Sequence, residues 1–265
     1  MGLVEKGADV LETRNLSIRF GGHVAVDAVS CCFKPGTLTA IVGPNGAGKT
    51  TYFNLISGQL PASSGQVLLD GEDITRLSAP LRTRRGLGRA FQLTQLFPNL
   101  TVHENVRLAI QARENGRGTG GPLDMLRVWL DRRDWIDEAH ALLQQVRLAD
   151  KAGATAASLP HGDQRKLEVA LLMALDPKVY LFDEPTAGMS VDEVPVVLDL
   201  IRQLKARRDI VILLVEHKMD VVHELADRIV VLHNGRLVAD GEPAAVIASP
   251  VVQEAYLGAA VEEAT

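Results

Sequence analysis

The sequence predicts an α/β fold with a mostly parallel sheet, an antiparallel β subdomain near the N-terminus and an inserted helical subdomain. The sheet is predicted by three apolar runs of strand length, residues 38–42, 179–182 and 210–215. Strands that are apolar on both faces are typical of buried parallel sheets, which need crossover helices. Helical spacing occurs in three segments that can supply those helices, residues 50–58, 164–175 and 194–205.

Short antiparallel strands with tight turns are predicted at two places outside that sheet. Residues 11–20 and 23–29 flank Gly21-Gly22, and Asn234-Gly235 separates two later apolar runs. Glycine-containing pairs between apolar runs are typical of hairpin turns. We expect the first hairpin to begin the β subdomain and the second to lie near the end of the core.

The middle of the chain predicts the helical insertion. Strand signals disappear between residues 94 and 157, and residues 124–148 have helical spacing behind the glycine-rich residues 117–121. We therefore expect a single domain for the whole chain, in which residues 94–157 form the helical subdomain. The core and the β subdomain are expected in residues 1–93 and 158–265.

Composition and charge exclude several classes of protein. The chain has 265 residues, is 46% hydrophobic and has a net charge of -5, so it is neither wholly disordered nor a strongly basic nucleic-acid binder. Its two cysteines, Cys31 and Cys32, are adjacent, which implies no disulfide framework and fits a reducing compartment. Residues 1–9 lack the apolar core of a secretory signal. No run approaches the roughly 18 to 20 apolar residues that span a bilayer.

A complete P-loop pattern follows the first apolar run. Its members are Gly43, Pro44, Asn45, Gly46, Ala47, Gly48, Lys49 and Thr50. The glycines let the backbone wrap a phosphate, and N–H groups at a helix start favour negative charge. Lys49 would reach the β- and γ-phosphates of a nucleotide, Thr50 would place its hydroxyl on Mg²⁺, and Thr51 would add a second hydroxyl. A glycine-rich turn without a ligand is the alternative.

Two acids follow the second apolar run, at the sheet edge where open α/β folds bind ligands. Asp183 would hold Mg²⁺ through water, and Glu184 could polarise an attacking water as a general base. An acid pair taken alone could equally cap a helix. The P-loop in the same chain favours catalysis.

His217 follows the third apolar run and could contact the γ-phosphate, although a lone histidine more often caps or packs. The tetrapeptide His217-Lys218-Met219-Asp220 also resembles the Asn-Lys-x-Asp motif with which GTPases bind the base. Its first residue differs from that motif. A GTPase would also leave two further segments unexplained.

Those segments are Phe91-Gln92 and Leu159-Pro160-His161-Gly162-Asp163-Gln164-Arg165, which opens a helix. With P-loop, glutamine, glycine-containing helix start, acid pair and histidine in this order, the chain resembles ABC-type ATPases over nearly its whole length. The resemblance implies a P-loop ATPase core that binds ATP and Mg²⁺ and hydrolyses ATP. It also implies that two such domains pair head to tail, with each ATP between one P-loop and the partner's signature helix.

The resemblance assigns roles to residues. Phe20 would stack on adenine, with a core aromatic as the alternative. Gln92 would bind Mg²⁺ or the attacking water and relay the nucleotide state to the segment that docks a membrane subunit. The residues implied to carry hydrolysis are Lys49, Gln92, Glu184 and His217. The residues implied to face the partner's ATP are Leu159, Pro160, His161, Gly162 and Asp163.

The signature departs from the common Leu-Ser-Gly-Gly-Gln. Pro160 replaces the serine whose hydroxyl meets the γ-phosphate, His161 replaces the first glycine, and Asp163 replaces the glutamine. Proline suits the first turn of a helix and anion binding relies on backbone N–H groups, so such a site can still function. Residues 187–190 match the segment through which the two ATP sites communicate.

The chain further resembles importers of branched-chain amino acids, through Phe91-Gln92-Leu93, Leu96-Phe97-Pro98 and Glu254-Ala255-Tyr256-Leu257-Gly258. Systems for amides, urea or lipopolysaccharide stay open as alternatives. The implied partners are an identical or different second ATPase subunit, two transmembrane permease subunits and, indirectly, a solute-binding protein. The implied location is cytoplasmic, on the inner face of the cell membrane. A soluble ABC ATPase acting on nucleic acid is disfavoured by the charge of -5, so no nucleic-acid partner is expected.

Overall fold

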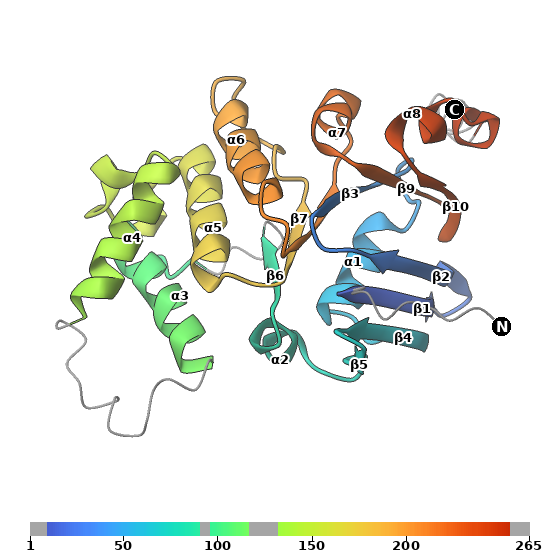
Figure 1. Cartoon of the computed structure of the whole chain (residues 1–265), viewed down its shortest axis with the longest axis horizontal. Helices are drawn as coiled ribbons and strands as arrows, with labels where there is room; N and C mark the ends of the chain where they lie inside the picture. The colour runs from blue at the N-terminus through green and yellow to red at the C-terminus, as the bar shows by residue number, and fades with distance from the viewer. Residues whose placement is uncertain (1–9, 91–95, 117–131, 255–265) are drawn as a thin grey trace. The chain divides into compact units, whose positions relative to one another are not determined.

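The computed structural model describes residues 10–90, 96–116 and 132–254 (Figure 1). The chain divides into two compact units. The first comprises Met1–Leu87, Lys178–Glu184 and Lys205–Thr265, and the second comprises Gly88–Pro177 and Pro185–Leu204. Within the described ranges, no helix is both long and apolar enough to cross a membrane.

The expected antiparallel β subdomain is present in the first unit. Its strands, in the spatial order β2-β1-β4-β5, are β2 His23–Phe33, β1 Leu11–Phe20, β4 Ser64–Leu69 and β5 Glu72–Asp73. β1 and β2 pair antiparallel across the Gly21-Gly22 turn. β2 runs beyond residue 29 to Phe33, because buried side chains continue to alternate through Cys31.

The second sheet is mostly parallel, as predicted. Its strands, in the order β10-β9-β3-β8-β7-β6, are β10 Arg236–Gly241, β9 Arg228–His233, β3 Thr37–Val42, β8 Val211–Val215, β7 Val179–Asp183 and β6 Leu87–Ala90. β9, β3, β8 and β7 pair parallel to one another, whereas β10 pairs antiparallel to β9 through the predicted Asn234-Gly235 turn.

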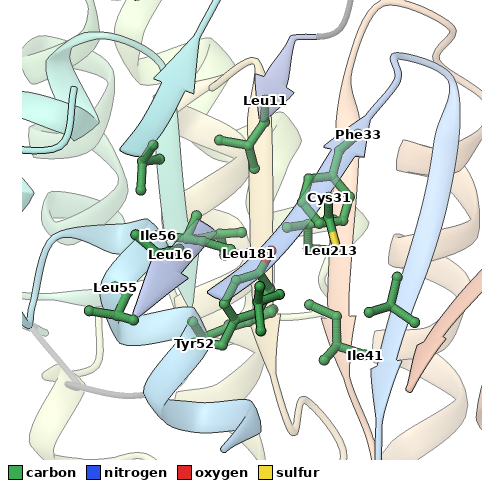
Figure 2. Packing of buried hydrophobic residues seen from close by; sticks show 14 of the residues in the cluster. Leu11, Leu16, Cys31, Phe33, Ile41, Tyr52, Leu55, Ile56, Leu181 and Leu213 are labelled. Carbon is green, nitrogen blue, oxygen red and sulfur yellow. The ribbon is translucent and has the colours of Figure 1, made fainter. Parts of the chain in front are cut away.

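The four parallel strands β9, β3, β8 and β7 are buried on both faces. Ile41 and Leu213 point into the larger core cluster, which also contains Leu11 of β1 and Tyr52 of the first helix (Figure 2). Ala40, next to Ile41 in β3, packs into the smaller cluster on the opposite face. This explains why the strands are continuous apolar runs and do not alternate.

Among the described residues of the first unit, helices include α1 Lys49–Ser57, α2 Ala79–Arg84, α7 Met219–Leu225 and α8 Pro243–Ile247. α1 is the predicted helix after the P-loop. It ends at Gly58, which has a left-handed backbone with φ of 79° and is therefore suited to a helix C-cap. α2 and α8 carry proline near their first position, where its missing N–H costs least.

The second unit is helical where it is described, apart from β6. Its α-helices are α3 Val102–Gly116, α4 Arg133–Gln145, α5 His161–Leu175 and α6 Val194–Lys205. α4 confirms only part of the helix predicted over residues 124–148: it begins after Arg132, whose backbone is not helical, and residues 124–131 lie outside the described residues. It stops at Gln145, short of the predicted end, because Arg147 turns left-handed with φ of 57°. Arg113 joins three helices, with Nη1 donating to Glu138 Oε1 at 2.6 Å and to Ala174 O at 3.1 Å.

Candidate functional site

The P-loop connects β3 to α1, and two of its glycines have no room for a side chain. A Cβ on Gly43 would lie 2.1 Å from Leu232 O, and one on Gly48 would lie 2.4 Å from Ala25 O. Gly48 also has φ of 95°, which side chains disfavour. The loop conformation therefore requires glycine at both positions.

Lys49 begins α1, and its ammonium turns back onto the loop. Nζ donates to Gly43 O at 2.7 Å and to Pro44 O at 2.8 Å. Burial lowers the pKa of Lys49, and the negative charges of Glu184 and Asp183 oppose that shift. No side chain caps the start of α1 and its first turn has no acid, so its N–H groups leave an electropositive end. Thr50 is exposed there and Thr51 is half-buried.

The turn between β9 and β10 contacts the P-loop and supports it. The sequence did not predict this contact. Gly235 donates its N–H to Ala47 O at 3.0 Å and accepts from the N–H of Asp27 at 2.8 Å. Arg236, next in the hairpin, pairs with the Asp27 carboxylate at 2.7 Å. The Asn-Gly pair predicted a hairpin, but no local signal shows which loop the hairpin contacts.

Asp183 and Glu184 lie at the carboxyl end of β7, as predicted. Asp183 is buried and pairs in register with Val215 of β8. Glu184 donates its N–H to Val215 O at 2.9 Å and has φ of 51°. A left-handed backbone is unfavourable for a residue with a long side chain, and such strain concentrates at functional sites.

The structure brings His217 and Glu184 together. His217 Nε2 lies 2.7 Å from Glu184 Oε1, so the loop after β8 meets the loop after β7. Glu216 holds the first of these loops. It is only 3% exposed, and its Oε2 accepts the N–H groups of His217 at 2.9 Å and Lys218 at 3.2 Å. Sequence reasoning missed Glu216, although an acid that directly follows a buried strand is itself a signal.

The predicted signature residues start α5 in the second unit. Pro160 caps the helix, His161 is exposed, and Leu159 and Gly162 are buried. Asp163 is also buried and pairs with two lysines. Lys166 Nζ donates to Asp163 Oδ1 at 2.8 Å, and Lys151 Nζ donates to Asp163 Oδ2. Burial alone would raise the pKa of Asp163, but the two lysine hydrogen bonds outweigh it, so its pKa lies below the ordinary value.

Two other predicted residues flank the P-loop in sequence. Phe20 is 49% exposed at the end of β1, so its ring does not belong to the core. Its predicted contact with adenine stays a prediction. Gln92 lies outside the described residues, together with Phe91 and Leu93. Phe97, further along the same segment, is exposed.

Comparisons with known proteins agree with this geometry. The family described as ABC transporter matches residues 26–187, and the family described as branched-chain amino acid ATP-binding cassette transporter matches residues 236–262. Two relatives are high-affinity branched-chain amino acid transport ATP-binding proteins. BraF of Pseudomonas aeruginosa is 36% identical over 95% of this chain and 98% of the relative, and LivG of Escherichia coli is 35% identical with the same coverage.

A solved structure has the same fold. The crystal structure of a nucleotide-free ATP-binding cassette from an ABC transporter superposes with a TM-score of 0.77 at 30% identity, over 93% of this chain and 98% of that one. The family match over residues 26–187 and the two relatives show that the chain is an ABC transporter ATPase, which binds ATP. Within that class, the chain belongs to the branched-chain amino acid ATP-binding cassette transporter family.

Proposed function

We propose that this chain is the ATP-hydrolysing subunit of an importer of branched-chain amino acids. BraF and LivG, whose names state that transport, are 36% and 35% identical over 95% of the chain. One observation supports the hydrolytic role above the others. His217 Nε2 lies 2.7 Å from Glu184 Oε1, which combines a general base with a neighbouring imidazole, and the charge of Glu184 also acts on the P-loop lysine, Lys49.

Each residue has a distinct task in this proposal. Glu184 accepts a proton from the attacking water, and His217 orients the Glu184 carboxylate and contacts the γ-phosphate. Lys49 exchanges the carbonyls of Gly43 and Pro44 for phosphate oxygens, which restores a strong charge-assisted pair for a buried ammonium. The uncapped start of α1 adds N–H donors for the phosphates.

The donors near the P-loop fit Mg²⁺. Thr50 offers an exposed hydroxyl at the start of α1, and Asp183 offers a carboxylate at the end of β7. Both are oxygen donors, which this ion prefers, and it commonly keeps waters and phosphate oxygens as its remaining ligands. When bound, Mg²⁺ would neutralise charge on the β- and γ-phosphates. Gln92 is proposed as a further ligand.

The proposed assembly places each ATP between two subunits. Leu159, Pro160, His161, Gly162 and Asp163 of one ATPase would face the nucleotide held by the P-loop and Phe20 of the other. The second ATPase is identical or different. Two permease subunits span the membrane, a solute-binding protein delivers the amino acid, and the ATPase pair lies on the cytoplasmic face of the cell membrane.

Replacing Glu184 by glutamine tests the hydrolytic role. Glu184→Gln keeps the hydrogen bond from His217 but cannot accept the proton, so we expect kcat to fall by a factor of about 10² to 10⁴. ATP binding persists, and the variant accumulates as an ATP-bound pair in size-exclusion chromatography. Glu224→Gln, an exposed acid on α7, is the matched control and hydrolyses ATP normally. Hydrolysis by Glu184→Gln at the wild-type rate would falsify the role of Glu184.

Capture of the complex tests the transport role. Tagged Glu184→Gln, loaded with ATP and Mg²⁺, is purified from detergent-solubilised source membranes and its partners are identified by mass spectrometry. We expect two polytopic subunits and a binding protein that takes up labelled leucine, isoleucine or valine. Recovery of ribosomal or nucleic-acid machinery without membrane proteins contradicts transport, and a binding protein for another solute contradicts the amino-acid assignment alone.

A further inference from the structure

In the second unit, the start of α5 and residues 188–193 each contain a glycine that is covered by a side chain of the other segment. Gly162 lies in the first turn of α5, and a Cβ on it would lie 2.1 Å from both carboxylate oxygens of Glu193. Gly188 has φ of +70°, and a Cβ on it would lie 3.2 Å from Cε1 of His161. The start of α5 and residues 188–193 therefore interlock in both directions.

The Glu193 carboxylate is fixed from two sides. Ser190 Oγ donates to its Oε2 at 2.9 Å and the Ser190 N–H donates at 3.3 Å, in the Ser-x-x-Glu arrangement that begins a helix. Lys166 Nζ lies 3.7 Å from its Oε1 and bonds Asp163 at 2.8 Å. The ammonium of Lys166 thus joins an acid of α5 to an acid that precedes α6.

These contacts leave little freedom for independent movement. Gly162, Asp163 and Lys166 are buried, and Glu193 is half-buried against them. A shift of the α5 start would separate the Lys166 ammonium from one of its two carboxylates, which costs free energy in a partly desolvated site. Packed groups of this kind move together because interiors have few voids to absorb a displacement.

We propose that Glu193 is a positioning residue that ties the signature turn (residues 159–163, at the start of α5) to residues 187–190. When ATP bound to the partner subunit contacts the signature turn, Glu193 would pass the resulting movement to residues 187–190. The inference rests on the proposed function, in which α5 faces the partner's ATP and residues 187–190 carry communication between the two sites. It also gives Gly162 a specific reason for being glycine, because the Glu193 carboxylate fills the space of its Cβ.

A double-mutant cycle between Gly162 and Glu193 tests the coupling. Gly162→Ala forces the Glu193 carboxylate out, and we expect at least a tenfold loss of kcat for ATP hydrolysis by the purified transporter complex, with KM for ATP within twofold of the wild-type value. Glu193→Ala lowers the same kcat several-fold. The double variant Gly162→Ala/Glu193→Ala loses no more than Glu193→Ala alone, because the truncated side chain leaves room for the new methyl group.

Two further variants separate shape from charge. Glu193→Gln keeps the size of the side chain, so Gly162→Ala/Glu193→Gln stays as impaired as Gly162→Ala. Asp192→Asn removes an equal charge from the exposed neighbouring position and leaves hydrolysis unchanged. Losses that multiply in the Gly162→Ala/Glu193→Ala variant overturn the proposal, because they mean that Gly162 and Glu193 act independently.

Thermal unfolding of the purified chain gives a readout that does not depend on activity. Gly162→Ala displaces the end of the Glu193 side chain, so we expect its effect on Tm to be less favourable in the wild-type background than in the Glu193→Ala background. If the wild-type complex hydrolyses no ATP, the proposed function fails, whereas the Tm cycle still reports the contact. If the wild type is active and the losses in both cycles are independent, the coupling alone fails.

Discussion

Glu216 shows how a single buried acid holds the loop that carries His217, one member of the proposed hydrolytic pair. Its carboxylate holds the N–H groups of His217 and Lys218, at the point where His217 reaches Glu184. We expect Glu216→Ala to lower kcat about tenfold or more, because two bonds to a charged acceptor are lost. KM for ATP stays unchanged, since the P-loop is untouched.

The matched variant Glu216→Gln keeps an oxygen that accepts both N–H groups, and it recovers most of the activity. Steady-state kinetics on the two variants checks this. Equal impairment of Glu216→Gln and Glu216→Ala would show that the negative charge matters, and not the position of the loop.

We expect Cys31 to make the stability of the fold fall at alkaline pH. It lies 4% exposed in the core of the first unit (Figure 2), and burial raises the pKa of its thiol to about 11. Between the ordinary thiol pKa and this value the unfolded chain loses a proton that the folded chain keeps. The free energy of unfolding therefore falls as pH rises through this window, by up to about 3 kcal/mol from this group.

Urea unfolding of wild type and Cys31→Ala between pH 7 and about 11 checks this dependence. The variant is less stable at pH 7 because of its cavity, but we expect a shallower decline with pH. Val29→Ala, a buried truncation on the same strand without a titratable group, retains the wild-type decline. Parallel curves for Cys31→Ala and wild type would remove Cys31 as the cause.

At the scale of elements, Arg82 of α2 caps the end of α1. It is 2% exposed, and its Nη1 donates to Leu55 O at 2.7 Å and Ile56 O at 2.6 Å. Nε and Nη2 donate to the carbonyls of Leu77 and Thr75. Burial lowers the pKa of Arg82 to about 10, yet the cation faces the negative end of the helix whose other end forms the P-loop.

We expect Arg82→Met to lower the free energy of unfolding by about 3 kcal/mol or more, because the buried carbonyls lose their donor. Urea denaturation measures the change. Arg84→Met removes an exposed arginine of the same helix and stays within about 0.5 kcal/mol of the wild type. A loss of the same size in both variants would mean that the charge of α2 matters, and not the contacts of Arg82.

The elements that the sequence predicted are those with local signals. The apolar strands, the P-loop, the acid pair after β7 and the Asn234-Gly235 turn each depend on a few adjacent residues. Contacts between distant segments have no such signal. Arg82 lies in a basic stretch that resembles a solvated surface, and nothing near Gly235 indicates that it bonds Ala47. The lysines that hold Asp163 were missed for the same reason.

At the scale of the whole molecule, the predicted ATP-binding groups fall into two sets. The P-loop, Asp183, Glu184 and His217 belong to the first compact unit, and the signature residues 159–163 belong to the second. In the proposed head-to-tail pair, one complete site needs the first set from one subunit and the second set from the other. A pair in which one subunit carries a P-loop mutation and the other carries a signature mutation then keeps one intact site.

Mixing two variants tests this division. Lys49→Ala abolishes the P-loop contact and Gly162→Ala disturbs the signature turn, so each chain alone hydrolyses ATP poorly. When the two are co-expressed in equal amounts, random pairing gives mixed pairs with one intact site, and we expect roughly a quarter of the wild-type rate. Separate tags on the two chains allow the mixed pair to be isolated and assayed.

If the wild-type chain alone is active but the mixture is not, a site shared between two copies is excluded. If the wild-type chain becomes active only with a different ATPase, the same mixing is done across that pair, with the signature change placed in this chain and the P-loop change in its partner.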